Sequence, residues 1–309
     1  MGASLIQKTK SYLKEYYSLY IMLLLPLTFF FVFRYLPIGN ILIAFKNYNI
    51  TRTVWEMDWA ANGGLFYFQQ AFNTQDFRFA LRNTVMLNLL DLLIGFPAPI
   101  ILALLLNELK FKMFKKVTQT IAYMPHFLSW IIVSGIALNL LAPGTGTVNI
   151  LIENMGGNSI PFLTQPTWWV GTYVLLGVWK SVGWNTIIYL AAITAVNPEL
   201  YEAAEMDGAG RFGKIWHVTL PGIRHVIVLL LILNLGHILG SEFDRPLSLG
   251  NTLVTNVSTV ISIFVYNHGI RGLRFSLSAA VGLFQSVVAV IFLVSANALA
   301  KKFGERGIW

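Results

Sequence analysis

The sequence contains no cysteine, and only 12% of its 309 residues are charged. The absence of cysteine excludes disulfide bonds, thiolate nucleophiles, thiolate-bound metals and iron–sulfur clusters. The charged share is about half that of soluble domains, while 56% of the residues are hydrophobic. Intrinsic disorder is therefore excluded, and a membrane protein is indicated. The five histidines lack a metal-binding spacing such as His-Glu-x-x-His, so we expect neither a metal nor another cofactor in this chain.

Apolar windows long enough to cross the ~30 Å hydrocarbon core of a bilayer occur six times. They predict an all-α polytopic membrane protein in which residues 1–309 form a single transmembrane domain. The first window follows several lysines but lacks a small-residue cleavage site, so we interpret it as an uncleaved anchor. The six predicted transmembrane helices are residues 16–33, 84–106, 117–142, 167–196, 226–240 and 275–300.

The distribution of lysine and arginine orients these spans, because cytoplasmic loops carry an excess of both residues. Six spans place both termini on one side, and we predict that this side is the cytoplasm, including the amino-terminal segment 1–15. The cytoplasmic segments then hold thirteen basic residues: Lys8, Lys10, Lys14, Lys110, Lys112, Lys115, Lys116, Arg211, Lys214, Arg224, Lys301, Lys302 and Arg306. The outside holds seven: Lys46, Arg52, Arg78, Arg82, Arg245, Arg271 and Arg274. This asymmetry explains the net charge of +8 without a nucleic-acid partner.

The predicted extracellular segment 241–274 contains an uncharged stretch, residues 246–270, that is long enough to cross a membrane. Threonine, serine and asparagine interleave there with valine, isoleucine and phenylalanine. This pattern predicts an amphipathic helix on the outer membrane surface instead of a seventh span. A seventh span would also move Lys301 and Lys302 to the outside.

The predicted cytoplasmic loop 197–221 has the pattern of two short helices. Asn197 can cap the first helix with Pro198 in its first turn, and Gly208 ends it. A second helix over 211–219 is expected to end against Pro221.

Two apparent nucleotide motifs in the loop 197–221 are rejected. The Gly-x-Gly-x-x-Gly pattern at 208–213 follows no strand, and the P-loop-like pattern has Ile215 where Mg²⁺ requires a hydroxyl.

The same loop carries a family resemblance. It resembles the EAA loop of ABC-importer permeases, which couples the permease to its ATPase, in Glu202, Ala203, Ala204, Asp207, Gly208, Ala209, Leu220 and Pro221, together with Ile215. Residues 82–84, 95–108, 123–130, 177–206 and 280–287 resemble carbohydrate-uptake permeases, in particular the LplB-type oligosaccharide and polysaccharide group.

This resemblance implies a six-helix permease subunit that imports oligosaccharides through the plasma membrane of a bacterium. It also implies a second homologous permease, two cytoplasmic ATPase subunits that hold ATP and magnesium, and an extracellular solute-binding lipoprotein. The chain itself is then not an enzyme. The loop 197–221 is expected to transmit closure of the ATPases to the transmembrane helices.

Polar side chains inside the predicted spans are candidates for a substrate pathway, because an ionisable group there costs on the order of 2.5–3.5 kcal/mol and normally faces a cavity or a partner. Aromatic and amide groups suit stacking on sugar rings and hydrogen bonding to hydroxyls. Packing between helices is the alternative role, and it is favoured for Asn88 and Asp91. The candidates are Tyr173, Lys180, Trp184, Asn185, Tyr189, Asn234 and His237.

Two other functions compete with the importer. An ion-coupled secondary transporter would use Lys180 and Asp91 as its coupling residues, and the cytoplasmic loop would be incidental. An intramembrane hydrolase would use Ser181 beside Lys180 as a Ser/Lys pair, although the sequence contains no group that would orient them.

Overall fold

The computed structural model describes residues 15–240, 242–302, 304 and 307–308. The regular structure of these residues is helical, and they contain no strand apart from one bridge between Lys46 and Trp59. The all-α prediction is therefore confirmed. The predicted cytoplasmic residues Lys8, Lys10, Lys14 and Arg306 lie outside the described residues.

Fifteen α-helices are described, and short 3-10 or π-helical segments extend or join several of them. The α-helices are α2 (Tyr17–Phe30), α3 (Phe66–Asn73), α4 (Gln75–Leu90), α5 (Pro97–Asn107), α6 (Lys112–Tyr123), α7 (Trp130–Leu141), α8 (Thr147–Asn154), α9 (Pro166–Thr194), α10 (Pro198–Met206), α11 (Arg211–Lys214), α12 (Leu220–Gly236), α13 (Asp244–Leu249), α14 (Thr255–Ser258), α15 (Ile261–Val265) and α16 (Phe275–Lys302). The joining segments are Phe31–Tyr35, Leu36–Phe45, Asp91–Gly95, Met124–Phe127, Ile215–Thr219, Thr252–Val254 and Tyr266–Arg271.

Five continuous helices are long and apolar enough to cross a membrane, and two bent helix pairs could raise the number to seven. The predicted number of six lies within this range. The first helix continues to Phe45 instead of ending at residue 33, and the second begins at Gln75 instead of residue 84. The five helices are Tyr17–Phe45, Gln75–Asn107, Pro166–Thr194, Arg211–Gly236 and Phe275–Lys302.

The fifth predicted span starts earlier than expected. The prediction that a short helix over 211–219 ends against Pro221 is wrong, because one helix runs continuously from Arg211 to Gly236. Pro221 lies in the first turn of α12, directly after the π-helical turn Ile215–Thr219. A proline has no N–H to donate, and the wide turn before it accommodates this missing hydrogen bond without ending the helix.

The third predicted span, residues 117–142, is not one helix. The helix over Lys112–Phe127 and α7 meet at an angle of 104°. Leu128 and Ser129 are extended at this bend, and the Ser129 hydroxyl accepts a hydrogen bond from the Ile132 N–H (3.3 Å) that starts α7. Apolar residues continue on both sides, so hydropathy alone does not reveal the change of direction.

The predicted amphipathic helix over 246–270 is also wrong. This stretch is a series of short helical segments with a bend of 114° between Thr252–Ser258 and Ile261–Arg271. Val254, Ile261 and Phe264 are at most 1% exposed. The segment contacts α4, α9 and α16, so these buried side chains pack against the rest of the protein, while Leu253 and Ile270 are 65% and 64% exposed.

Polar residues of α4 hold this bent segment in place. The Asn83 side-chain amide donates to the carbonyl oxygens of Asn256 and Thr259, both at 2.9 Å. The Thr84 hydroxyl accepts from the Ile261 N–H at 2.9 Å. These bonds satisfy backbone groups that the bends leave without a helical partner, which is a requirement at membrane depth.

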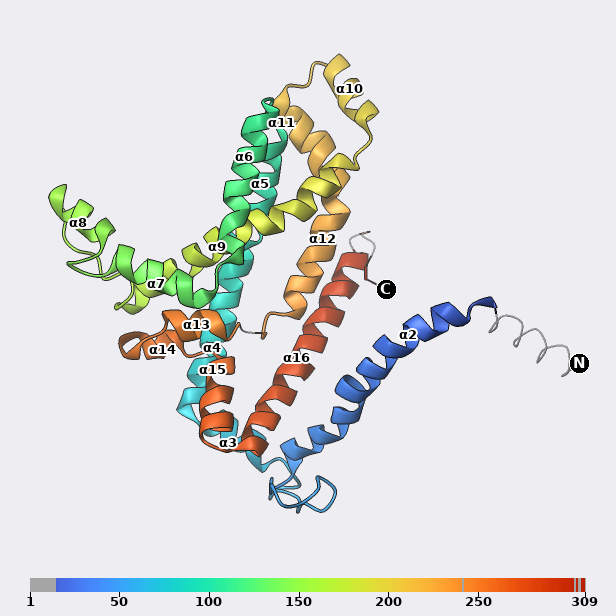
Figure 1. The fold of residues 1–309 in the computed structure, drawn as a ribbon, viewed down its shortest axis with the longest axis vertical. Helices are drawn as coiled ribbons and strands as arrows, with labels where there is room; N and C mark the ends of the chain where they lie inside the picture. The colour runs from blue at the N-terminus through green and yellow to red at the C-terminus, as the bar shows by residue number, and fades with distance from the viewer. Residues whose placement is uncertain (1–14, 241, 303, 305–306, 309) are drawn as a thin grey trace, which may run out of the picture.

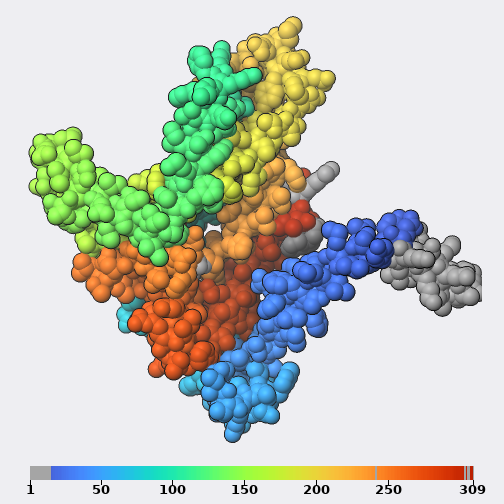
Figure 2. Space-filling model, viewed as in Figure 1, coloured from blue at the N-terminus to red at the C-terminus, as the bar shows by residue number. Residues whose placement is uncertain are grey.

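The long helices form an elongated body with α10 at one end and α3 at the other (Figure 1). Along this body α5 packs against α9, and α16 packs against α12. Two parts extend from the body in Figure 2, the amino-terminal helix and the arm of α7 and α8. No residue of α2 is buried. These extended parts leave large apolar surfaces uncovered within a single chain.

Candidate functional site

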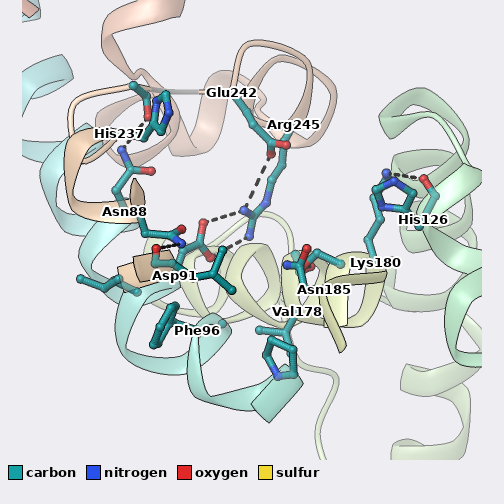
Figure 3. Close-up of a pocket in the computed structure, with 18 of the residues that line it drawn as sticks. Asn88, Asp91, Phe96, His126, Val178, Lys180, Asn185, His237, Glu242 and Arg245 are labelled. Atoms are coloured by element: carbon teal, nitrogen blue, oxygen red, sulfur yellow. Dashed lines mark hydrogen bonds and ion pairs between the residues drawn. The ribbon is translucent and has the colours of Figure 1, made fainter. Parts of the chain in front are cut away.

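A cavity of about 430 Å³ lies among helices that belong to candidate membrane spans. Figure 3 shows polar side chains that reach the cavity from α4 and the segment Asp91–Gly95, from the segment Met124–Phe127, from α9, and from the end of α12 through α13. The side chains that give it polar, charged and aromatic character are Asn88, Asp91, Phe96, His126, Trp130, Tyr173, Lys180, Ser181, Asn185, Tyr189, Asn234, His237, Glu242 and Arg245.

An ion pair between Asp91 and Arg245 forms one wall of this cavity. Arg245 is 5% exposed, and its guanidinium donates to both carboxylate oxygens of Asp91, at 2.7 and 3.3 Å. It also donates to the carbonyl oxygen of Tyr173 and lies 3.6 Å from the centre of the Tyr173 ring. The sequence analysis counted Arg245 only among the basic residues of the outer segments and did not anticipate this buried ion pair, whereas the packing role favoured for Asp91 agrees with it.

Gly177 gives the guanidinium access to the backbone of α9. A Cβ atom at this position would overlap the terminal nitrogen atoms of Arg245. Tyr173 and Gly177 are one turn apart on the same face of α9, so the arginine lies across the helix without an intervening side chain. The ion pair thereby connects α13 to two of the candidate spans.

Lys180 occupies another part of the cavity wall. Its ammonium group donates to the carbonyl oxygen of His126 (3.0 Å) and lies 5.3 Å from the centre of a Trp130 ring. His126 is in the last turn before the bend between α6 and α7. A cation is favourable there because the carbonyl groups at the end of a helix carry partial negative charge.

The structure brings six of the seven predicted pathway residues to this cavity: Tyr173, Lys180, Asn185, Tyr189, Asn234 and His237. Trp184 is not part of the lining. Its ring stacks on that of His126, with 4.5 Å between ring centres and 3° between planes. The bend at 128–129 brings His126 against α9, and the hydropathy of the sequence gives no sign of this bend.

The sequence analysis missed several lining residues, above all Arg245, Glu242 and Trp130. A signal for Arg245 was present, because a carboxylate at the position of Asp91 inside a span needs a positively charged partner. The sequence could not show which basic residue is this partner, because Asp91 and Arg245 are 154 positions apart and only the fold brings them together. Asn88 also lines the cavity, and its amide donates to the carbonyl oxygens of Ile238 and Gly240 at 2.8 and 2.9 Å.

The geometry does not support a Ser/Lys pair. The Ser181 hydroxyl donates to the Gly177 carbonyl oxygen at 2.7 Å, while the Lys180 ammonium donates to His126. Their side chains are thus bonded to different carbonyl groups. Within the described part of the chain, no group of three His, Asp or Glu residues could hold a metal ion.

The loop 197–221 lies at the end of the molecule that carries α10 (Figure 1). The predicted cap is confirmed: Asn197 accepts a hydrogen bond from the Glu199 N–H (3.1 Å), and Pro198 is in the first turn of α10. Two side chains of α10 bond it to the following helix. The Tyr201 hydroxyl donates to the Thr219 hydroxyl (3.1 Å), and Lys214 pairs with Glu205 (3.3 Å).

Gly208 ends α10 with a φ angle of +79°, in the region that favours glycine. The Gly208 N–H donates to the Glu205 carbonyl oxygen (3.0 Å), and the Ala209 N–H donates to that of Ala204 (2.9 Å). These two bonds are the Schellman arrangement of a helix end. Gly208 therefore fixes the direction in which the chain leaves α10.

The surface of this loop is apolar and uncovered. Met206 is 89% exposed and Phe212 is 88% exposed, while Leu200 and Trp216 are 52% and 69% exposed. Large apolar side chains left this exposed are typical of contact with a membrane or another protein. The coupling residues suggested by the family resemblance are on α10, at its carboxyl end and at the start of α12: Glu202, Ala203, Ala204, Asp207, Gly208, Ala209, Leu220 and Pro221.

Comparisons with known proteins agree with this arrangement. Residues 95–305 match the family described as binding-protein-dependent transport system inner membrane component. Protein LplB of Bacillus subtilis (strain 168) is 45% identical over 291 residues, which cover 94% of this chain and 91% of LplB. The polygalacturonan/rhamnogalacturonan transport system permease protein YteP of the same organism is also 45% identical over 291 residues, covering 94% of this chain and 90% of YteP.

A solved structure matches the whole fold. It is a chain of a bacterial alginate ABC transporter in complex with an alginate pentasaccharide-bound periplasmic protein. The TM-score is 0.87 at 37% sequence identity, and the match covers 96% of this chain and 99% of that chain.

Proposed function

The chain belongs to the family of binding-protein-dependent transport system inner membrane components, and from this premise we propose that it is the permease subunit of an ABC importer for oligosaccharides. The names of its relatives describe transport permeases and not enzymes. The observation that carries the proposal is the cavity of about 430 Å³. It combines aromatic rings with amide and charged groups inside the membrane-spanning helices, which suits the stacking and hydrogen bonding that sugars require.

The substrate class is supported by the relatives and by the chemistry of the cavity. YteP is named for polygalacturonan and rhamnogalacturonan, and the related structure is named for alginate. A pathway for sugar hydroxyls requires groups that donate and accept hydrogen bonds. Asn185 and Asn234 provide both kinds of group, and Trp130 provides a ring surface.

The proposed partners are a second homologous permease, two cytoplasmic ATPase subunits and an extracellular solute-binding lipoprotein. ATP and magnesium are bound by the ATPases, and this chain holds no cofactor. The family description names a binding protein, and the related alginate transporter was solved with a periplasmic protein. The uncovered apolar surfaces of α2 and the arm of α7 and α8 are suited to lipid and to a second permease.

The loop 197–221 is the proposed contact with an ATPase. Met206 and Phe212 are exposed apolar anchors for a groove on that subunit. The bonds between Tyr201 and Thr219 and between Glu205 and Lys214 link α10 to the helix that continues into the membrane. A displacement of α10 by its partner would therefore be transmitted to α12.

The proposed orientation places both termini and the loop 197–221 in the cytoplasm of a bacterium. The connection between α5 and α6 lies at the same end as α10 and α11 (Figure 1). Lys110, Lys112, Arg211 and Lys214 belong to these segments. Basic residues gathered at one end agree with the positive-inside rule.

The proposal is tested by purifying the complex through a tag on this chain and reconstituting it in proteoliposomes with its binding protein. We expect an ATPase to copurify and uptake of oligosaccharide to require ATP. Uptake that follows a proton or sodium gradient without ATP would favour the secondary transporter, in which Lys180 and Asp91 couple ion and substrate. Absence of any ATPase from the purified complex would contradict the importer.

A further inference from the structure

Four charged side chains line the cavity, and three of them form one cluster. Arg245 is bonded to both oxygens of Asp91 and lies 4.0 Å from the carboxylate of Glu242. The guanidinium is also in contact with the Tyr173 carbonyl oxygen, and it is 5% exposed. The charge of Arg245 is therefore satisfied within the protein and is not accessible to a ligand.

Lys180 differs from this cluster, because none of the described carboxylates lies within ion-pair distance of its ammonium group. Its neighbours are the carbonyl oxygen of His126 (3.0 Å) and the face of Trp130 (5.3 Å). An ammonium group has three donors, and the contact with His126 uses one of them. A positive charge inside the membrane is costly unless it faces a cavity or meets an anion.

The surroundings of Lys180 define the kind of anion. The Trp130 ring lies beside the ammonium group and also 5.2 Å from the Arg245 guanidinium, and Asn185 follows Lys180 on the same helix and also lines the cavity. An aromatic face beside an amide and a cation suits a sugar ring that carries a carboxylate. In Figure 3 Lys180 lies apart from Asp91 and Glu242, so the ammonium group is separated from the negative charges of the cluster.

We propose that Lys180 is a specificity-determining residue that binds the carboxylate of an acidic sugar unit as it passes through the cavity. The substrate class is then an oligosaccharide that contains uronic acids. This inference rests on the proposed function, since it assumes that oligosaccharides enter the cavity. It assigns to Lys180 a contact with the substrate charge, beyond a hydrogen bond to hydroxyl groups.

A purely structural role for Lys180 predicts that its replacement lowers the uptake of charged and uncharged sugars equally. The contact with His126 ties α9 to the bend between α6 and α7, and its loss could disturb the fold. Lys180→Gln removes the charge but keeps a side-chain donor for the His126 carbonyl oxygen. Lys180→Arg keeps both the charge and the donors. Asn185→Ala, also in the cavity, removes an amide without changing charge and is the matched control.

The experiment measures ATP-dependent uptake of two probes by the full complex in proteoliposomes. The probes are an oligogalacturonate and the same oligosaccharide with its carboxylates methyl-esterified. Each rate is divided by the wild-type rate for that probe, so the preference of the binding protein cancels. The melting temperature and the basal ATPase rate of each variant report whether the fold is kept.

We expect Lys180→Gln to lower uptake of the acidic probe at least about tenfold relative to the ester, because an ion pair is lost only with the acid. Lys180→Arg should keep the wild-type preference, and Asn185→Ala should lower both rates alike. Equal loss of both probes in Lys180→Gln, or no loss of either, would overturn the inference. Wild-type uptake of the ester but not of the acid would overturn it while leaving the importer intact. Uptake of neither probe by the wild type would also overturn the inference, and the proposed function would fall with it only if the complex takes up no oligosaccharide with ATP.

Discussion

In the cavity the charged side chains of Asp91 and Arg245 are bonded to each other within one chain, whereas in the loop 197–221 the apolar side chains of Met206 and Phe212 are almost fully exposed. The cavity is thus a site that this chain largely completes. The loop has a defined backbone but lacks a surface to pack against. The difference teaches that substitutions in the cavity should act first on the stability of this chain, and substitutions in the loop on its association with a partner.

The largest effect on stability is expected from Asp91→Ala. Loss of the carboxylate leaves the charge of Arg245 buried without its main partner, which costs on the order of 3–5 kcal/mol. Thermal unfolding of the detergent-purified complex measures the effect. The double variant with Arg245→Met should recover part of the loss.

The matched substitution in the loop is Glu205→Ala, which breaks the ion pair with Lys214. Glu205 is 74% exposed, and exposed pairs contribute about 0–1 kcal/mol. A loss of stability as large as that of Asp91→Ala would contradict the difference between the two regions.

Gly177→Ala should have the second largest effect. A Cβ at this position overlaps the Arg245 guanidinium, and overpacking of this kind costs about 1–3 kcal/mol. Gly171→Ala, on the same helix with no atom within 4 Å of the added Cβ, is the control and should be neutral or slightly stabilising. Equal unfolding temperatures for the two variants would show that the close approach of Arg245 to α9 is not required.

Trp184→Leu should have a smaller effect. The stack on His126 contributes about 0.5–1.5 kcal/mol beyond the area that the rings bury. Because Trp184 does not line the cavity, the ratio of uptake between different oligosaccharides should remain that of the wild type. A changed ratio would return Trp184 to the substrate pathway.

Met206→Ser should have the smallest effect on the stability of the chain, within about 0.5 kcal/mol, because the side chain is 89% exposed. The amount of ATPase that copurifies should nevertheless fall severalfold. Ile50→Ser, at a residue that is 82% exposed in the segment between Phe45 and α3, is the control and should leave that amount unchanged. If the copurifying ATPase fell by a similar amount in both variants, the loop 197–221 would not be a specific contact with the ATPase.

The two regions also differ in how well they could be predicted from the sequence. The loop is contiguous, so its signals are local. Asn197, Pro198 and Gly208 specify where α10 begins and ends, and the structure has these features. Only the expected stop at Pro221 was wrong, because a π-helical turn precedes it.

The cavity depends on contacts between distant residues. The sequence identified polar positions on single helices, such as Tyr173 and Lys180, from the cost of placing them in a membrane. Its hydropathy gave no indication of the bend at 128–129 that brings His126 onto α9. Nor could it pair Asp91 with Arg245, since the pairing requires the folded segment 246–270, whose packing depends on bonds from Asn83 and Thr84.

The central claim is that the loop 197–221 couples an ATPase to the helices around the cavity. It is tested most directly by substrate-stimulated ATPase activity of the reconstituted complex with Gly208→Val or Gly210→Val. A β-branched residue at the φ of +79° found at Gly208 would strain the turn by roughly 1–2 kcal/mol and redirect the chain. Gly210, with a φ of −71° and open space around it, accepts the same side chain.

We predict that Gly208→Val abolishes stimulation while the complex still assembles, and that Gly210→Val retains it. Wild-type stimulation and uptake in Gly208→Val would contradict the account.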